Sequence, residues 1–181
     1  MLFPQKLLSG RLNLGYDSRM SLFCDQTKIK LKGGNGGNGC VSFRREKFEP
    51  KGGPDGGDGG NGGSIFLKAN DALNSLIHLN SQRQFQAQHG EKGTGQRCHG
   101  KNGEDLTLEV PLGTVVRELR GGQRIDVADL STKGQIAKIV RGGKGGFGNA
   151  HFVSSIRQAP AFAELGEDGE ELEVELELKL V

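Results

Sequence analysis

The stretch KGGPDGGDGGNGG at residues 51–63 decides the fold, because its glycines recur at every third position. One series is Gly53, Gly56, Gly59 and Gly62, and a second is Gly57, Gly60 and Gly63. A period of three is that of the polyproline II helix, an extended helix without internal hydrogen bonds. Glycine along one face of such a helix lets neighbouring backbones approach closely. We therefore expect ordered polyproline II segments that bundle side by side.

The same spacing returns in KGGNGGNG (32–39) and RGGKGGFGN (141–149), and a looser glycine block, HGEKGTGQRCHGKNG, covers 89–103. From these blocks we predict structural glycines at Gly33, Gly36, Gly39, Gly53, Gly56, Gly59, Gly62, Gly142, Gly145 and Gly148. A collagen triple helix needs a long strict repeat rich in proline, and this chain has only 5 Pro. Flexible linkers are the other alternative, but they do not need triplet spacing between strand-like sequences.

Short strands of alternating apolar and polar residues separate the glycine blocks. The clearest is ELEVELELKL at 171–180, which we expect to present Glu171, Glu173, Glu175 and Glu177 to solvent. We expect strands at 26–32, 40–44, 64–68, 106–110, 114–118, 124–128, 136–140 and 171–180. One short helix is expected within 71–79, with Asp71 as its cap. The predicted fold class is therefore all-β.

Composition and charge limit the functions that the chain can have. The net charge is only +2, yet residues 28–51 hold seven Lys or Arg, whereas 164–177 hold eight acidic residues and no basic one. Cys24, Cys40 and Cys98 form no CxxC pair, which argues against a disulfide framework or a zinc site. Apolar runs are too short for a membrane span. We expect a cytoplasmic protein, or an organellar matrix protein if the basic residues 1–19 are a transit peptide.

Motifs for catalysis are missing from this sequence. The pattern GxGxxG matches at 34–39, 57–62 and 143–148, but no convincing helix follows any of the three, so the matches carry little information. No GxxxxGK[ST] phosphate-binding loop occurs, and the four histidines show no metal-ligand spacing. We expect no enzyme activity, no metal and no cofactor within these residues.

Basic residues lie at the ends of the glycine blocks, and Phe43, Phe48 and Phe147 lie among them. The candidate RNA-binding residues are Arg44, Arg45, Lys47, Lys51, Arg97, Lys101, Arg141 and Lys144. If the glycine segments bundle, we expect their loops to gather at one tip, where cations and aromatic rings suit phosphates and unpaired bases. The alternative is that these charges only keep loops poor in side chains in solution.

Several motifs together resemble the N-terminal domain of the Obg family of GTPases. They are DQTKIKLKGGNGGNGCVSFRREKFEPKGGPDGGDGGNGG (25–63), VPLGTVVRE (110–118), ADL (128–130), RGGKGGFGN (141–149), AP (159–160) and LELKLV (176–181). The resemblance covers 22–181 and implies six polyproline II segments on a small β-barrel, preceded by a poorly ordered extension at 1–21. It also implies a GTP-binding domain, with GTP and magnesium as its ligands, after residue 181.

The family resemblance further implies a role in assembly of the large ribosomal subunit, with the basic loop tips inserted into ribosomal RNA. In the second loop the block at 89–103 departs from the family pattern, so the choice among Lys92, Arg97 and Lys101 stays open. The alternative function is a protein-interaction scaffold that recruits stress-signalling partners or regulates an attached GTPase domain.

Overall fold

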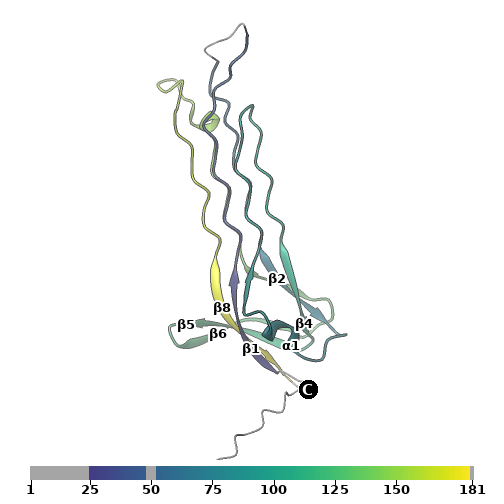
Figure 1. Ribbon diagram of the computed structural model, residues 1–181. Coiled ribbons are helices and arrows are strands. Elements are labelled where there is room, and N and C mark those ends of the chain that lie inside the picture. Colours follow the sequence, from purple (N-terminus) through teal and green to yellow (C-terminus); the bar gives the residue numbers. More distant parts are fainter. Residues whose placement is uncertain (1–24, 48–51, 180–181) are drawn as a thin grey trace, which may run out of the picture.

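The computed structural model describes residues 25–47 and 52–179, which form a β-rich base with a long stem standing on it (Figure 1). The elements in chain order are β1 (Gln26–Lys32), β2 (Ile65–Asn70), α1 (Ile77–Asn80), β3 (Gln84–Gln86), β4 (Leu106–Pro111), β5 (Thr114–Arg120), β6 (Gln123–Leu130), β7 (Ile136–Val140), the 3₁₀ turn η1 (Asn149–Phe152) and β8 (Glu171–Leu178). Strands dominate and helix is almost absent, so the all-β class is confirmed. The expected extension at 1–21 lies outside the described residues.

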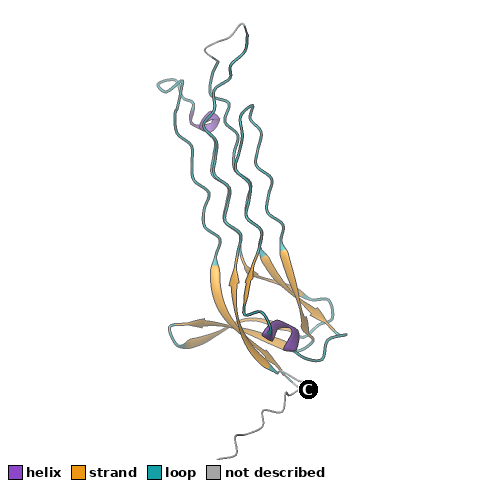
Figure 2. Ribbon diagram, in the orientation of Figure 1, coloured by secondary structure: helices purple, strands orange, loops and turns teal. Residues whose placement is uncertain are grey.

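The base consists of two sheets. A 5-stranded sheet has the order β3-β1-β8-β5-β6, and a 3-stranded sheet has the order β4-β2-β7. Among the described residues no strand pairing closes them into the expected small barrel. All strands except the β5–β6 hairpin lead directly into or out of the stem (Figure 2). Each of these strands is thus continuous with a stem segment at one of its ends. The base consists of two open sheets.

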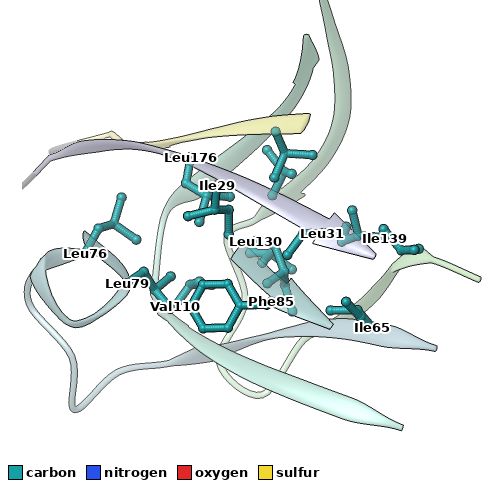
Figure 3. Close-up of a cluster of buried hydrophobic side chains, with 14 of the residues drawn as sticks. Ile29, Leu31, Ile65, Leu76, Leu79, Phe85, Val110, Leu130, Ile139 and Leu176 are labelled. Atoms are coloured by element: carbon teal, nitrogen blue, oxygen red, sulfur yellow. The ribbon is translucent and has the colours of Figure 1, made fainter. Parts of the chain in front are cut away.

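A single apolar core fills the base and is drawn in Figure 3. Ile29 and Leu31 of β1 are buried while the lysines between them face outward, as the alternation predicts. Phe85 of β3 joins this core, as do Leu76 and Leu79 of the helical turn. The stem contributes no residue to this core, because its segments carry hardly any apolar side chains.

Two of the expected elements differ in the structure. The strand expected at 40–44 is wrong: that stretch begins at the end of the glycine-rich segment 33–40 and continues into the loop that follows it, and only an isolated bridge joins Phe43 to Pro54. The helix is a single turn whose N-cap position is Leu76, and Asp71 instead forms an ion pair with Lys133 (Oδ2 to Nζ, 2.7 Å). The loop before α1 thus uses its carboxylate for a surface contact and not for capping.

Strand β3 and the solvent face of β8 also correct the sequence predictions. β3 is short and polar at both ends, so alternation could not identify it; it is held by parallel pairing with β1. Glu175 of β8 is buried, with 1% of its side chain exposed, although an exposed position was expected. Gln26 donates a hydrogen bond to Glu175 Oε1 and Arg124 Nε lies 3.1 Å from Oε2, so neighbouring donors cover this carboxylate.

In the part of the chain that the structure describes, no helix has the length and apolar character needed to cross a bilayer.

Candidate nucleic-acid interface

Within residues 25–47 and 52–179, the stem consists of six extended segments, numbered here in chain order. Stem segments 1 to 6 are 33–40, 56–63, 88–94, 98–105, 141–148 and 164–170. They are joined sideways by backbone hydrogen bonds at every third residue. From segment 1, for example, the N–H groups of Gly33, Gly36 and Gly39 donate to segment 6. Those of Gly34, Gly37 and Cys40 donate to segment 2. The lateral bonds therefore follow the three-residue glycine period of the sequence.

Close contact between these backbones excludes side chains at the stem glycines. At nine of the ten predicted structural glycines, an added Cβ would lie closer than 3.0 Å to a backbone carbonyl oxygen, a separation that real Cβ atoms essentially never show. These nine are Gly33, Gly36, Gly39, Gly56, Gly59, Gly62, Gly142, Gly145 and Gly148. The tenth, Gly53, has no atom within 4 Å of such a Cβ. It lies beyond the stem, in the first loop.

The number of glycine series in a segment equals the number of neighbouring segments whose carbonyls it abuts. In segment 2, one series faces segment 1 and the other faces segment 4, so two of every three residues are glycine. Segments 1 and 5 have the same two-series pattern. Segments 3, 4 and 6 each abut one neighbour in this way and carry one glycine in three. The glycine repeat in each segment therefore reflects the number of neighbouring segments that it contacts closely.

Short polar side chains occupy the third position of the two central segments and satisfy neighbouring backbone groups. Asn35 and Asn38 of segment 1 accept hydrogen bonds from Gly169 and Gly166. Asp58 and Asn61 of segment 2 accept from the N–H groups of Gly148 and Gly145. Because buried backbone donors need partners, these side chains complete the lateral hydrogen bonding.

Three loops connect the stem segments at the end opposite the sheets (Figure 1). Asn149, which is fully buried, ties the first loop to the third. Its Oδ1 accepts a hydrogen bond from Gly56 N (2.8 Å), and its Nδ2 donates to the carbonyls of Ser42 and Pro160 (3.0 Å each). This one side chain anchors both loops on the stem.

The second loop joins the first through Asp55. The N–H of Gln96 donates to Asp55 Oδ2 (3.1 Å), and the N–H of Arg97 donates to the Asp55 carbonyl (2.7 Å). Gln96 and Arg97 both have left-handed backbones, with φ of 59° and 56°. Such a conformation is uncommon for residues other than glycine, so these two bonds hold an unusual turn in place.

A pocket of about 700 Å³ at the tip collects three of the predicted RNA-binding residues, namely Arg44, Arg45 and Arg97. All three are exposed, and they come from two different loops. Arg44 forms an ion pair with Glu46, while no ion pair within 4.0 Å joins Arg45 or Arg97 to a described acidic residue. The pocket wall is therefore cationic. Lys47 is also exposed in the first loop, and Lys51 lies outside the described residues.

The remaining predicted RNA-binding residues lie along the stem and not at its tip. Arg141 follows β7 directly and packs beside Gly33 at the foot of the stem, and Lys144 lies one triplet higher, beside Gly36. Both line a groove that also contains Glu167, Asp168 and Glu170. Lys101 lies beside Gly60 in mid-stem, 3.8 Å from Glu104. The expectation that all these cations share one tip is therefore wrong.

A third loop also lies at the tip, and the glycine repeats do not predict it. Arg157 stacks its guanidinium over the Phe162 ring, 5.1 Å from the centroid, and Ile156 beside it is 97% exposed. An apolar and basic run between two glycine segments, FVSSIRQAP at 152–160, was the signal available. This run contains no glycine repeat, so the repeats did not predict the loop.

Two histidines near the tip share one carboxylate. Asp58 Oδ2 lies 2.8 Å from His151 Nε2 and 3.5 Å from His99 Nδ1. In the sequence these histidines show no metal-ligand spacing. Among the described residues no group of three or more His, Cys, Asp or Glu side chains is arranged to hold a metal ion.

Comparison with known proteins identifies the family. The family model GTP1/OBG matches residues 24–180, nearly the whole chain. The chain belongs to the GTP1/OBG family. A protein named GTPase Obg from Chlorobium phaeobacteroides (strain BS1) is 53% identical over 159 residues, which are 88% of this chain and 48% of that protein. Its namesake from Chlorobaculum parvum (strain DSM 263 / NCIMB 8327) is 52% identical, over 88% of this chain and 47% of that protein. The GTP1/OBG chain described here thus spans about half the length of these curated relatives.

Proposed function

We propose that this GTP1/OBG chain is an RNA-docking module that acts in assembly of the large ribosomal subunit. The observation that carries the proposal is the cluster of Arg44, Arg45 and Arg97 at the end of a narrow stem. Arginine binds phosphate with a planar set of donors, and a narrow stem suits entry between RNA helices. The proposal excludes Lys101, Arg141 and Lys144 from direct RNA contact, because they lie along the stem and not at its tip.

We further propose that the stem segments are polyproline II helices. The lateral hydrogen bonds have the three-residue period of that helix, and Gly148 has φ −71° and ψ 164°, near the polyproline II values. Each segment is hydrogen-bonded to its neighbours, so the stem is ordered before RNA arrives. Binding then costs little conformational entropy in the stem.

We propose that GTP is bound by another part of the family's proteins and not by the residues described here. The relatives are named GTPases, and this chain matches less than half of their length. No GxxxxGK[ST] motif occurs in these 181 residues. We propose that GTP and magnesium bind the portion of the relatives outside the match, and that this module directs that portion to ribosomes in the cytoplasm.

Sedimentation with large ribosomal subunits from a bacterium tests the RNA-docking proposal. The chain is expected to sediment with large subunits more than with small ones, and the logarithm of the binding constant should fall with log salt by about 0.7–0.9 per phosphate contacted. Replacing Arg44, Arg45 and Lys47 together with alanine should weaken binding and flatten that slope. Unchanged binding by this triple variant would refute the assignment of the tip.

A second candidate function, a protein-interaction scaffold, is favoured by one observation at the base. Ile125 and Val127 on the edge strand β6 are 42% and 40% exposed, and Ile136 on β7 is 57% exposed. Exposed apolar side chains on a sheet edge are typical of a protein contact. Binding to subunits that resists high salt, and that Ile125→Glu abolishes while the tip variant does not, would favour this alternative.

A further inference from the structure

The tip pocket has a carboxylate among its lining residues. Asp55 lies on the segment that leads into the stem, and only 9% of the residue is exposed. Its backbone is fixed on both sides, because its N–H donates to Ser42 and its carbonyl accepts from Arg97. The side chain is held in the pocket by its burial and by the hydrogen bond that its Oδ2 accepts from the N–H of Gln96.

One oxygen of this carboxylate lacks a hydrogen bond. Oδ2 accepts from the N–H of Gln96, whereas Oδ1 is buried and has no hydrogen-bond partner. The arginines that line the same pocket are not within 4.0 Å of it. A buried acceptor without a partner destabilises a fold, so its retention in a pocket indicates a ligand that supplies the donor.

The remaining pocket wall limits what that donor can be. Oδ2 is already occupied, so the ligand must supply one donor for Oδ1. In RNA a base amino group, such as cytosine N4, and a ribose 2′-hydroxyl are both single donors. The lining residues are Arg44, Arg45, Glu46, Gly53, Pro54, Asp55, Gln96 and Arg97, and none of them is aromatic. The 2′-hydroxyl is joined directly to the sugar–phosphate backbone that the arginines would bind, whereas an amino group lies on the base edge, farther from the phosphates.

We propose that Asp55 Oδ1 accepts a hydrogen bond from a ribose 2′-hydroxyl while Arg45 and Arg97 bind the adjacent phosphates. Asp55 is then the residue by which the tip distinguishes RNA from DNA, since the 2′-hydroxyl is the group that differs between them. The inference rests on the proposed RNA-docking function and adds to it a specificity that arginine contacts with phosphates alone do not provide.

The ligand-side test uses the unaltered chain. Binding of fluorescent single-stranded oligouridylate is compared with that of its 2′-deoxy and 2′-O-methyl counterparts of the same length at low salt. Neither counterpart has a 2′ donor, so each should bind about tenfold more weakly, the loss expected for one charge-assisted hydrogen bond. Equal binding of all three would overturn the inference and leave RNA docking standing; binding of none would overturn both.

The protein-side test compares two variants that each remove one negative charge from the pocket. Asp55→Asn keeps an oxygen for the Gln96 N–H and replaces the charged acceptor with an amide donor. A 2′-hydroxyl can still accept from that donor, but it loses its charge-assisted hydrogen bond, so the RNA-to-DNA affinity ratio should fall several-fold. Glu46→Gln should strengthen binding to RNA and DNA equally and leave the ratio unchanged. A ratio that survives in Asp55→Asn, or affinities that follow the base and not the sugar when oligoadenylate is used, would overturn the assignment. If Asp55→Asn does not fold, the ligand series decides.

Discussion

At the scale of single residues, the stem depends on the lack of side chains at its glycines. Each glycine of a series leaves space that a neighbouring carbonyl fills, and no side chain can move aside because the obstructing atoms are backbone. Overpacking of a close-packed interior generally costs 1–3 kcal/mol and occasionally more. The stem glycines are therefore a set of positions where even a methyl group is too large.

Gly59 offers the sharpest test of this close packing. An added Cβ at Gly59 would collide with the Gly37 carbonyl, whereas one at Gly53 would meet nothing within 4 Å. Gly59→Ala is expected to lower the free energy of unfolding by about 2 kcal/mol or more, measured by urea denaturation. Gly53→Ala is the matched control and should change it by less than about 0.5 kcal/mol. Equal effects of the two substitutions would show that close packing is not the reason for the glycines.

Asn149 is the residue on which the loop ends depend. Replacing it with alanine leaves the buried Gly56 N–H and the Pro160 carbonyl without this partner, and it removes one of the two donors of the Ser42 carbonyl. We expect Asn149→Ala to cost about 1–3 kcal/mol, seen as a lower midpoint in urea denaturation. Asn102→Ala, which removes one exposed hydrogen bond to Asn61, should cost far less. A smaller loss at Asn149 than at Asn102 would contradict its role as an anchor.

At the scale of elements, β1 and β8 form a ladder in which lysines oppose glutamates. Lys30 Nζ lies 2.7 Å from Glu171 Oε1, and Lys32 lies 3.8 Å from Oε2. The hydrogen bond and charge of Lys30 lower the pKa of Glu171 below its ordinary 4.5, and those of Glu171 raise the pKa of Lys30 above 10.5. These exposed pairs favour the observed register of β1 and β8 at the end of the ladder next to the stem.

The stability that this pair adds should depend on pH at both ends of the range. A lowered Glu171 pKa gives stability that is present above pH 4.5 and is lost as pH falls through the folded value. A raised Lys30 pKa gives stability that is present below pH 10.5 and is lost as pH rises through the folded value. Unfolding of wild type and Lys30→Gln should therefore differ at neutral pH and converge at acidic pH, below the folded pKa of Glu171. A difference that persists there, or that ignores added salt, would argue against an ion pair.

Strands were predictable from the sequence where apolar and polar residues alternate over several positions, and not elsewhere. The alternation of Ile29 and Leu31 with lysines gave β1, and the leucines of 171–180 gave β8. β3 could not be found, because three residues with one apolar side chain carry no period. Glu175 was misplaced for a related reason: the twisted sheet buries it under Arg124, which lies far away in sequence.

At the scale of the whole molecule, the stem separates the loops from the apolar core (Figure 1). Its six segments lie side by side, so the separation is the length of one segment. The glycine repeat gave the existence of this stem from sequence alone, because close packing of backbones has a strict residue requirement. It could not give the height of each cation along the stem. Arg141 and Lys144 lie inside a glycine block as loop residues would, but the block is a stem segment and the loop begins after it.

That difference in height supplies the most direct test of the central claim, that RNA is bound by the arginines at the tip. Arg45→Ala with Arg97→Ala and Arg141→Ala with Lys144→Ala remove the same charge, one pair from the tip and the other from the foot and side of the stem. Binding to large ribosomal subunits is to be measured for both over a range of salt concentrations. The tip pair should weaken binding and lower the salt slope by about 1.4–1.8, while the stem pair leaves both nearly unchanged. Equal losses for the two pairs would contradict the claim.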